Sequence, residues 1–186
     1  MLALAKSPLT SIRGAAELLQ GELNPEDRAR LLQTIETATA QMQTQLDALR
    51  RLAAAREPLG KGPVLLSDVV DGIETSARLE ILGDGLIPLD RVGLKAVLEQ
   101  LIQNAVAHGA DHVTLDRSTD RLIVFDNGKG IATGNRARVF DPFFTTRREA
   151  GGTGLGLSIV RAMLEASGAE ITLLERENGA GFEIRF

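Results

Sequence analysis

The first 57 residues carry a spacing of apolar side chains that is typical of packed helices. Apolar positions recur in alternating steps of three and four residues, and no aromatic residue interrupts them. Repeated over heptads, this spacing forms a seam between neighbouring helices. The seam positions are Leu9, Ile12, Ala16 and Leu19 in a first helix and Leu32, Ile35, Met42, Leu46, Leu49 and Ala53 in a second.

A helix boundary lies between these two segments. Gly21 can end the first helix, and Asn24 followed by Pro25, Glu26 and Asp27 is typical of the start of the second. The segment is therefore predicted to be a helical hairpin. Because two helices cannot cover so long a seam, we expect two copies to form a four-helix bundle, which makes the protein a homodimer. The alternative is a hairpin that docks on the rest of its own chain.

A second boundary lies at residues 58–63, where two prolines and two glycines end the helical spacing. We interpret it as a linker between a helical domain at 1–57 and a second domain at 64–186. Strand patterns in the second domain occur at 64–66, 78–82, 86–89, 112–117, 121–125, 170–174 and 181–186. Helices are expected at 91–107, at 154–167, and from a cap at Ser67 and Asp68 to about Ala77. This order predicts an α/β sandwich with a mixed sheet and helices on one face.

Composition excludes several classes of function. The formal charge is -4 and no basic run is long enough to follow a nucleic-acid backbone, so we expect no nucleic-acid partner. With no cysteine and two histidines, thiol chemistry, zinc fingers and transition-metal sites are not expected. No apolar run could span a bilayer and no signal peptide is visible, so this chain is expected to be soluble and to make no membrane contact.

Three segments carry residues suited to binding a nucleotide. Residues 126–131, Asp-Asn-Gly-Lys-Gly-Ile, follow a predicted strand, and an aspartate there can accept a hydrogen bond from an exocyclic amine; the alternative is an ordinary turn. Residues 151–157, Gly-Gly-Thr-Gly-Leu-Gly-Leu, precede a predicted helix and can form an anion cradle; the alternative is a flexible loop. Asn104 lies beside the apolar stripe of its helix, where it needs a ligand, Mg²⁺ or a backbone partner.

The order of these segments resembles the ATP-binding domain of sensor histidine kinases. Asn104, Asp126–Ile131, Phe140–Arg147 and Gly152–Leu157 resemble its N, G1, F and G2 boxes in family order. Residues 6–14 resemble the downstream half of the family's phosphoacceptor box, and the hairpin resembles its dimerisation domain. The resemblance implies a Bergerat-type (GHKL) fold in the second domain, with ATP and Mg²⁺ as cofactors.

The resemblance also implies roles for individual residues. Asp126 is expected to bind the adenine amino group, Asn104 to coordinate Mg²⁺ on the phosphates, and Arg147 or Arg148 to reach the γ-phosphate from a mobile lid at 132–153. The lid would be anchored by Phe140, Phe143 and Phe144. His108 matches a position near the nucleotide, although a surface histidine at a helix end is the alternative, and His112 is expected to be structural. The expected nucleotide site comprises Asn104, His108, Asp126, Gly128, Gly130, Ile131, Phe144, Arg147, Gly152, Thr153, Gly154, Leu155 and Gly156.

The chain departs from the family at the phosphoacceptor. In the family the phosphorylated histidine lies five residues before the proline that is here Pro8, so Ala3 occupies its position and Leu4 that of the acidic neighbour. Ser7 matches a polar residue used in phosphatase chemistry. A further departure is Gln100, where many members have asparagine. With Met1 two residues before the acceptor position, we expect the first helix to lack its usual preceding turns.

The leading hypothesis is the catalytic core of a two-component sensor kinase that lacks its own acceptor histidine. The alternative is a non-enzymatic, nucleotide-gated scaffold or phosphatase that docks a response regulator. An ATPase or chaperone of the same superfamily is a third hypothesis, disfavoured because Gln100 replaces the glutamate that would activate water. We expect a homodimer that binds a response regulator receiver domain, in the cytoplasm, with a sensor or membrane anchor preceding residue 1 in the parent protein.

Overall fold

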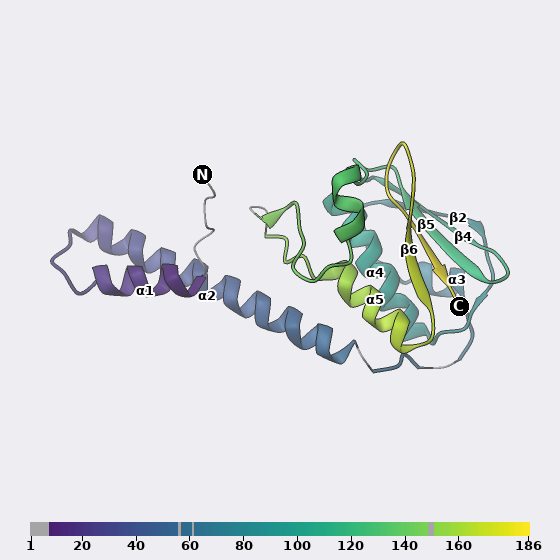
Figure 1. Ribbon diagram of the computed structural model, residues 1–186, viewed down its shortest axis with the longest axis horizontal. Coiled ribbons are helices and arrows are strands. Elements are labelled where there is room, and N and C mark those ends of the chain that lie inside the picture. Colours follow the sequence, from purple (N-terminus) through teal and green to yellow (C-terminus); the bar gives the residue numbers. More distant parts are fainter. Residues whose placement is uncertain (1–7, 56, 61, 149–150) are drawn as a thin grey trace.

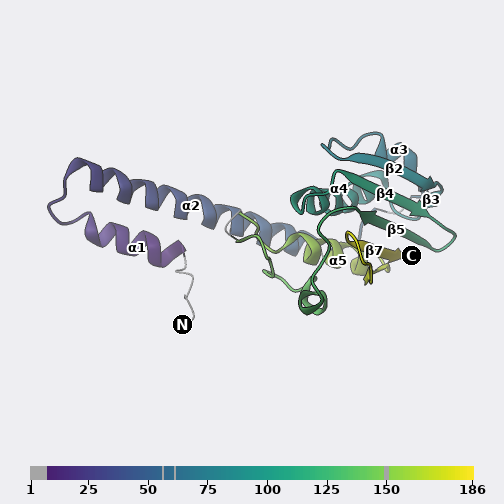
Figure 2. The ribbon, with the colours of Figure 1, turned by 90° about the horizontal axis from the view of Figure 1, so that it is seen from above.

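The computed structural model describes residues 8–55, 57–60, 62–148 and 151–186, with only the backbone of residues 48, 51 and 52. Helices α1 (Pro8–Leu18) and α2 (Pro25–Ala54) form an antiparallel hairpin. In Figures 1 and 2 this hairpin projects away from an α/β domain, and only the end of α2 lies beside it. The hairpin therefore does not dock along the rest of its own chain.

The hairpin follows from the capping and seam residues of the sequence. The Asn24 side chain accepts a hydrogen bond from the Asp27 amide at 2.8 Å, which confirms the expected N-cap. Ala15 and Ala38 are buried between the two helices. Three seam residues of α2 remain largely open, since Leu32, Leu46 and Leu49 are 49%, 52% and 43% exposed. One face of the hairpin therefore lacks an apolar partner within the described chain.

The second domain contains a five-stranded mixed sheet of order β2-β4-β5-β7-β6, in which only the β2–β4 pair is parallel. Helices α4 and α5 cover one face of it (Figure 2). The helices are α3 (Leu66–Val70), α4 (Arg91–Ala107) and α5 (Gly156–Ala166), with a 3-10 helix η1 (Thr133–Arg138). The main-sheet strands are β2 (Arg78–Gly83), β4 (His112–Arg117), β5 (Arg121–Asp126), β6 (Glu170–Leu174) and β7 (Gly181–Arg185). A small antiparallel pair is formed by β1 (Val64–Leu65) and β3 (Leu86–Ile87). The predicted α/β class with a mixed sheet and helices on one face is confirmed.

The core lies between the sheet and α4. The predicted apolar stripe of α4 is buried throughout, and the inward residues of the central strands complete the layer. These residues are Leu94, Val97, Leu98, Leu101, Ile102 and Ala105 of α4, and Val113, Leu115, Leu122, Val124, Phe182 and Ile184 of β4, β5 and β7. A fully buried side chain of this size contributes roughly 1.5–3 kcal/mol, so this layer fixes α4 on the sheet.

The prediction of a helix capped at Ser67 and Asp68 and reaching about Ala77 was wrong in both the cap and the length. It begins at Leu66 and ends at Val70, and neither Ser67 nor Asp68 caps it. Asp84 instead accepts a hydrogen bond from the Ser67 amide at 3.1 Å, a contact across 17 positions. Tight backbone bonds at Asp71, Gly72 and Ile73 then close the helix, so the chain turns early toward β2.

Candidate nucleotide-binding site

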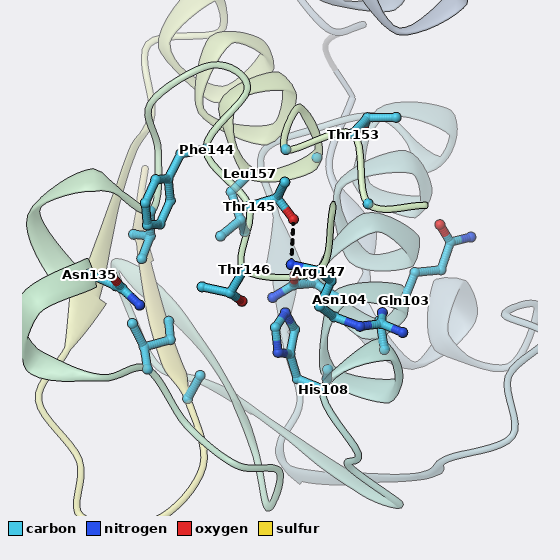
Figure 3. Close-up of a pocket in the computed structure, with 18 of the residues that line it drawn as sticks. Gln103, Asn104, His108, Asn135, Phe144, Thr145, Thr146, Arg147, Thr153 and Leu157 are labelled. Atoms are coloured by element: carbon cyan, nitrogen blue, oxygen red, sulfur yellow. Dashed lines mark hydrogen bonds between the residues drawn. The ribbon is translucent and has the colours of Figure 1, made fainter. Parts of the chain in front are cut away.

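A cavity of about 500 Å³ opens between α4, the start of α5 and the segment that joins β5 to α5. Its volume lies in the usual range of small-molecule sites. Figure 3 shows side chains from both helices and from the joining segment around it. Its lining includes Gln100, Gln103, Asn104, His108, Asp126, Gly130, Ile131, Asn135, Phe144, Thr145, Thr146, Arg147, Gly152, Thr153, Gly154, Gly156, Leu157 and Ala180.

Asp126 supplies a nearly buried carboxylate at the end of β5. The residue is 8% exposed. The Oδ1 atom accepts hydrogen bonds from the amides of Gly128 at 2.8 Å and Ala180 at 3.1 Å. Because both bonds go to the same oxygen, Oδ2 is left to accept a bond from a ligand. The carboxylate is thus fixed by the backbone and keeps one free acceptor in the cavity wall.

Gly130 and Gly179 allow three backbone segments to meet behind this carboxylate. Gly179 has a φ of +69°, and a Cβ there would overlap the carbonyl of Asp126. A Cβ on Gly130 would lie 2.7 Å from the Gly179 carbonyl oxygen. Neither Gly179 nor Ala180 was among the residues expected at the site. The run Gly-Ala-Gly at 179–181 was the available signal.

Helix α4 brings Asn104 and His108 to the cavity one turn apart, and Arg147 of the joining segment lies beside them (Figure 3). Burial lowers the pKa of His108, the positive charges of Arg147 and Lys129 lower it further, and Asp126 opposes them. The fold therefore favours the neutral imidazole at the end of α4. Arg147 gives this part of the cavity a positive charge suited to anions.

The start of α5 presents unpaired backbone donors. Within the described chain, the amides of Gly156, Leu157 and Ser158 have no hydrogen-bond acceptor, as expected for the first turn of a helix. Gly154 has a φ of +71° and packs against the Phe143–Phe144 backbone, which no larger residue could do. A Cβ on Gly156 would lie 2.6 Å from Nε2 of Gln100. The glycine spacing thus sets an anion-binding helix start against α4.

Most of the expected nucleotide-site residues meet in this cavity. Gly128 and Leu155 do not line it: the Gly128 amide holds Asp126, and Leu155 is fully buried. The acceptor positions Ala3 and Leu4, and Ser7, lie outside the described residues.

The aromatic anchors of the joining segment differ from one another. Phe140 packs edge to face on Phe182 with ring centroids 6.2 Å apart, and Arg138 lies 4.6 Å from the ring centroid of Phe144. Phe143 was expected to be a third anchor, and that was wrong. It has a φ of +65° and is 43% exposed, because the backbone turns at this residue toward Gly154 and directs the ring to solvent.

Two features are absent from the described part of the chain. Among the described residues, no group of three or more acidic or histidine side chains could hold a metal ion. In the described part of the chain, no helix is both long enough and apolar enough to cross a membrane.

Comparisons with known proteins find one family in each half of the chain. The family model "Histidine kinase-, DNA gyrase B-, and HSP90-like ATPase" matches residues 89–186, and "His Kinase A (phospho-acceptor) domain" matches residues 6–58. The sensor protein kinase PilS of Pseudomonas aeruginosa is 35% identical over 97% of this chain and 38% of its own length. The alginate biosynthesis sensor protein KinB of the same species is 28% identical over 90% of this chain and 32% of its own. The chain thus spans less than half the length of these curated relatives.

Solved structures agree with the fold. Full-length ShkA in complex with AMPPNP matches with a TM-score of 0.61 and 26% identity over 96% of this chain and 42% of ShkA. Histidine kinase ThkA in complex with the response regulator TrrA matches with a TM-score of 0.66 and 25% identity over 95% of this chain and 56% of ThkA. A helical hairpin followed by this α/β domain defines the core of a histidine kinase. The chain belongs to the histidine kinase-, DNA gyrase B- and HSP90-like ATPases and, within them, to the sensor histidine kinases.

Proposed function

We propose that this chain binds Mg-ATP in the cavity between α4 and α5 and transfers the γ-phosphoryl group to a histidine carried by another chain. One observation carries the proposal. A single cavity contains both a fixed carboxylate with a free oxygen, on Asp126, and the open start of a helix, at Gly156. These two groups are complementary to the two ends of a nucleoside triphosphate.

The adenine end is assigned to Asp126. Its Oδ2 can accept a hydrogen bond from the exocyclic amine of adenine, whereas the carbonyl oxygen of guanine at the equivalent position would meet a second acceptor. Ile131 and Ala180 supply apolar contact for the ring. His108, kept neutral by its surroundings, can either donate or accept a hydrogen bond beside them.

The phosphate end is assigned to the start of α5 and to Arg147. The free amides of Gly156, Leu157 and Ser158 form the N-terminal turn of α5, where the helix dipole favours negative charge. Mg²⁺ would be held by phosphate oxygens together with the amide oxygen of Asn104, which lines the cavity. Bound there, the ion would neutralise charge as it develops on the transferred group.

The acceptor must supply its own general base. Among the described residues that line the cavity, Asp126 is the sole carboxylate, and we assign it to the base-recognition end. Glu99 lies next to Lys95 at 3.7 Å and lines a different groove. Among the described lining residues, no carboxylate is therefore left at the phosphates to activate a water molecule.

The absence of a histidine at position 3 supports a partner in trans, and it equally supports the alternative of a nucleotide-gated scaffold that docks a response regulator. The open leucines of α2 support a homodimer as the setting for either function. We place this activity in the cytoplasm, where ATP and receiver domains are available.

Two measurements test the proposal. Titration with a fluorescent ATP analogue should show saturable binding that requires Mg²⁺. Radiolabelled ATP should then phosphorylate a second kinase chain that carries an acceptor histidine but has its own ATP site disabled. Binding without any transfer would favour the scaffold, and absence of binding would contradict both functions.

A further inference from the structure

The segment after α2 is fastened to the α/β domain before the first strand begins. The Leu59 amide donates a hydrogen bond to Oγ of Ser167 at 3.0 Å, across 108 positions. The Asp90 amide donates to the Gly60 carbonyl at 2.9 Å. Leu59 also packs against the core of the domain. Residues 59 and 60, a pair named here the strap, are therefore part of the α/β domain although they lie in the predicted linker.

The two residues that bind the strap, Ser167 and Asp90, also cap helices. Ser167 is the C-cap of α5 and donates from Oγ to the Met163 carbonyl at 2.9 Å, so toward the strap its hydroxyl acts as an acceptor and not as a donor. Asp90 is the N-cap of α4, and its Oδ1 accepts from the Gly93 amide at 2.7 Å. The strap thus joins the two helices at the ends opposite the cavity.

Close packing makes the attachment specific. A Cβ on Gly60 would overlap the Asp90 carboxylate, and a Cβ on Gly93 would lie 3.0 Å from Cβ of Leu59. Small residues at these two positions let the strap lie directly on the start of α4. A second groove of about 380 Å³ runs from this region along α4 and α5 and shares Gln100 and Gln103 with the nucleotide cavity.

We propose that Ser167 and Asp90 are positioning residues that limit the orientations of the ATP-binding domain relative to the hairpin by holding the strap, Ser167 through its hydroxyl and Asp90 through its backbone amide. The pivot between the two domains then lies on the N-terminal side of Leu59. Any force from α2 reaches α4 and α5 together, and these two helices carry Asn104 and the phosphate-binding helix start. The role in phosphoryl transfer rests on the proposed function, whereas the position of the pivot does not.

Distance measurements between spin labels test the pivot directly. The chain contains no cysteine, so cysteines introduced at the exposed positions Gln45 in α2 and Thr172 in β6 give two unique labels. The labelled chain is diluted with unlabelled chain so that distances within one chain dominate. Ser167→Ala should at least double the width of the distance distribution, and Ser167→Thr, which keeps the hydroxyl, should restore it. The exposed Ser76→Ala is the matched control and should change nothing. Equal widths for Ser167→Ala and the parent would overturn the proposal.

Two further readouts separate positioning from folding and from the proposed function. Affinity for the fluorescent ATP analogue should stay within twofold in Ser167→Ala, and a larger loss would overturn a purely positioning role. In a chain with Ala3→His and Leu4→Glu, Ser167→Ala should lower kcat for phosphoryl transfer at least fivefold with KM for ATP unchanged, and Ser167→Thr should recover it. An unchanged kcat would overturn the role in transfer. If the parent chain binds no nucleotide at all, the proposed function fails, and the label distances still decide the position of the pivot.

Discussion

The carboxylate of Asp126 accepts a hydrogen bond from the amide of Ala180, 54 positions later in the chain. In the reverse direction, the Asp126 amide donates to the Ala180 carbonyl at 2.9 Å. This reciprocal pair ties the end of β5 to the start of β7, so the sheet and the Gly128 amide of the following loop together orient the carboxylate. A ligand that meets Oδ2 therefore meets a group already held in place.

Asp126→Asn should abolish most nucleotide binding without unfolding the protein. The asparagine oxygen can still accept from Gly128 and Ala180, whereas its amide group would face the adenine amine as a second donor. We expect at least tenfold weaker binding, which corresponds to about 1.4 kcal/mol. In the parent chain, Mg-ATP at a hundredfold excess over Kd should stabilise the fold by about 2.7 kcal/mol and raise Tm. Asp47→Asn, an equal change of charge on exposed α2, should keep the full Tm shift; a normal shift in Asp126→Asn would refute the adenine assignment.

Gly179→Ala should destabilise the domain far more than Gly168→Ala. Both glycines have positive φ, +69° and +80°, so each alanine bears a similar backbone strain of roughly 1–2 kcal/mol. At Gly179 the new Cβ would also overlap the Asp126 carbonyl, whereas at Gly168 nothing lies within 4 Å. The difference between the urea unfolding midpoints of the two variants measures the steric cost of the new Cβ at position 179. Similar midpoints would show that the close contact of three segments behind Asp126 does not contribute to stability.

The parts of the fold that the sequence predicted are those whose signals are local. Helix α4 runs from Arg91 to Ala107 as expected, because its apolar stripe lies within the helix itself; the cap at Asp90 was not predicted. The hairpin cap at Asn24 is equally local. The paired strands β4 and β5 likewise follow from alternation on either side of a short turn.

The parts that could not be predicted depend on contacts between distant segments. In the first turn of helix α3 the Ser67 amide donates a hydrogen bond to the Asp84 carboxylate. These residues are 17 positions apart, so the sequence around Ser67 does not reveal the contact. The same holds for the strap, which depends on Ser167, and for Ala180 in the cavity wall. Motif order predicted which residues line the cavity, but the direction of Phe143 is set by its contact with Gly154, which depends on the path of the whole segment.

The free energy of unfolding should decrease as the pH is lowered, because His108 becomes protonated. The folded-state pKa of this group is lowered from 6.5, chiefly by burial and then by Arg147 and Lys129. Between the folded and unfolded pKa values the unfolded chain binds more protons, so the stability from neutral His108 is complete above about pH 6.5 and is lost as the pH falls below it. His108→Asn should flatten the dependence of the unfolding free energy between pH 7.5 and 5.5. Arg147→Met should make this pH dependence weaker, because one of the charges that lower the His108 pKa is removed. An unchanged pH dependence in His108→Asn would show that other groups cause it.

The open face of α2 should be the dimer interface. Leu46 and Leu49 are 52% and 43% exposed in the hairpin, so covering the exposed half of each side chain is worth about 1 kcal/mol. Leu46→Asp with Leu49→Asp should therefore yield a monomer in sedimentation velocity experiments while nucleotide binding is retained. Gln45→Asp, on the exposed part of the same helix, should leave the dimer intact. A parent chain that is monomeric at high concentration would contradict the interface.

Restoring the acceptor should convert the chain into one that phosphorylates a histidine on its own hairpin. As it stands it should accumulate no acid-labile phosphate, because the expected acceptor position is Ala3 and both histidines, His108 and His112, lie in the ATP-binding domain. Ala3→His with Leu4→Glu introduces a nucleophile and a neighbouring carboxylate, the base that the nucleotide cavity itself lacks. We expect acid-labile phosphate after incubation with Mg-ATP, and its loss when Asp126→Asn is added. Ala3→His alone should react more slowly, since the imidazole then lacks the carboxylate. Acid-labile phosphate on the unmodified chain would show that Ala3 is not the acceptor position, whereas a restored chain that binds ATP but stays unlabelled would favour the scaffold function.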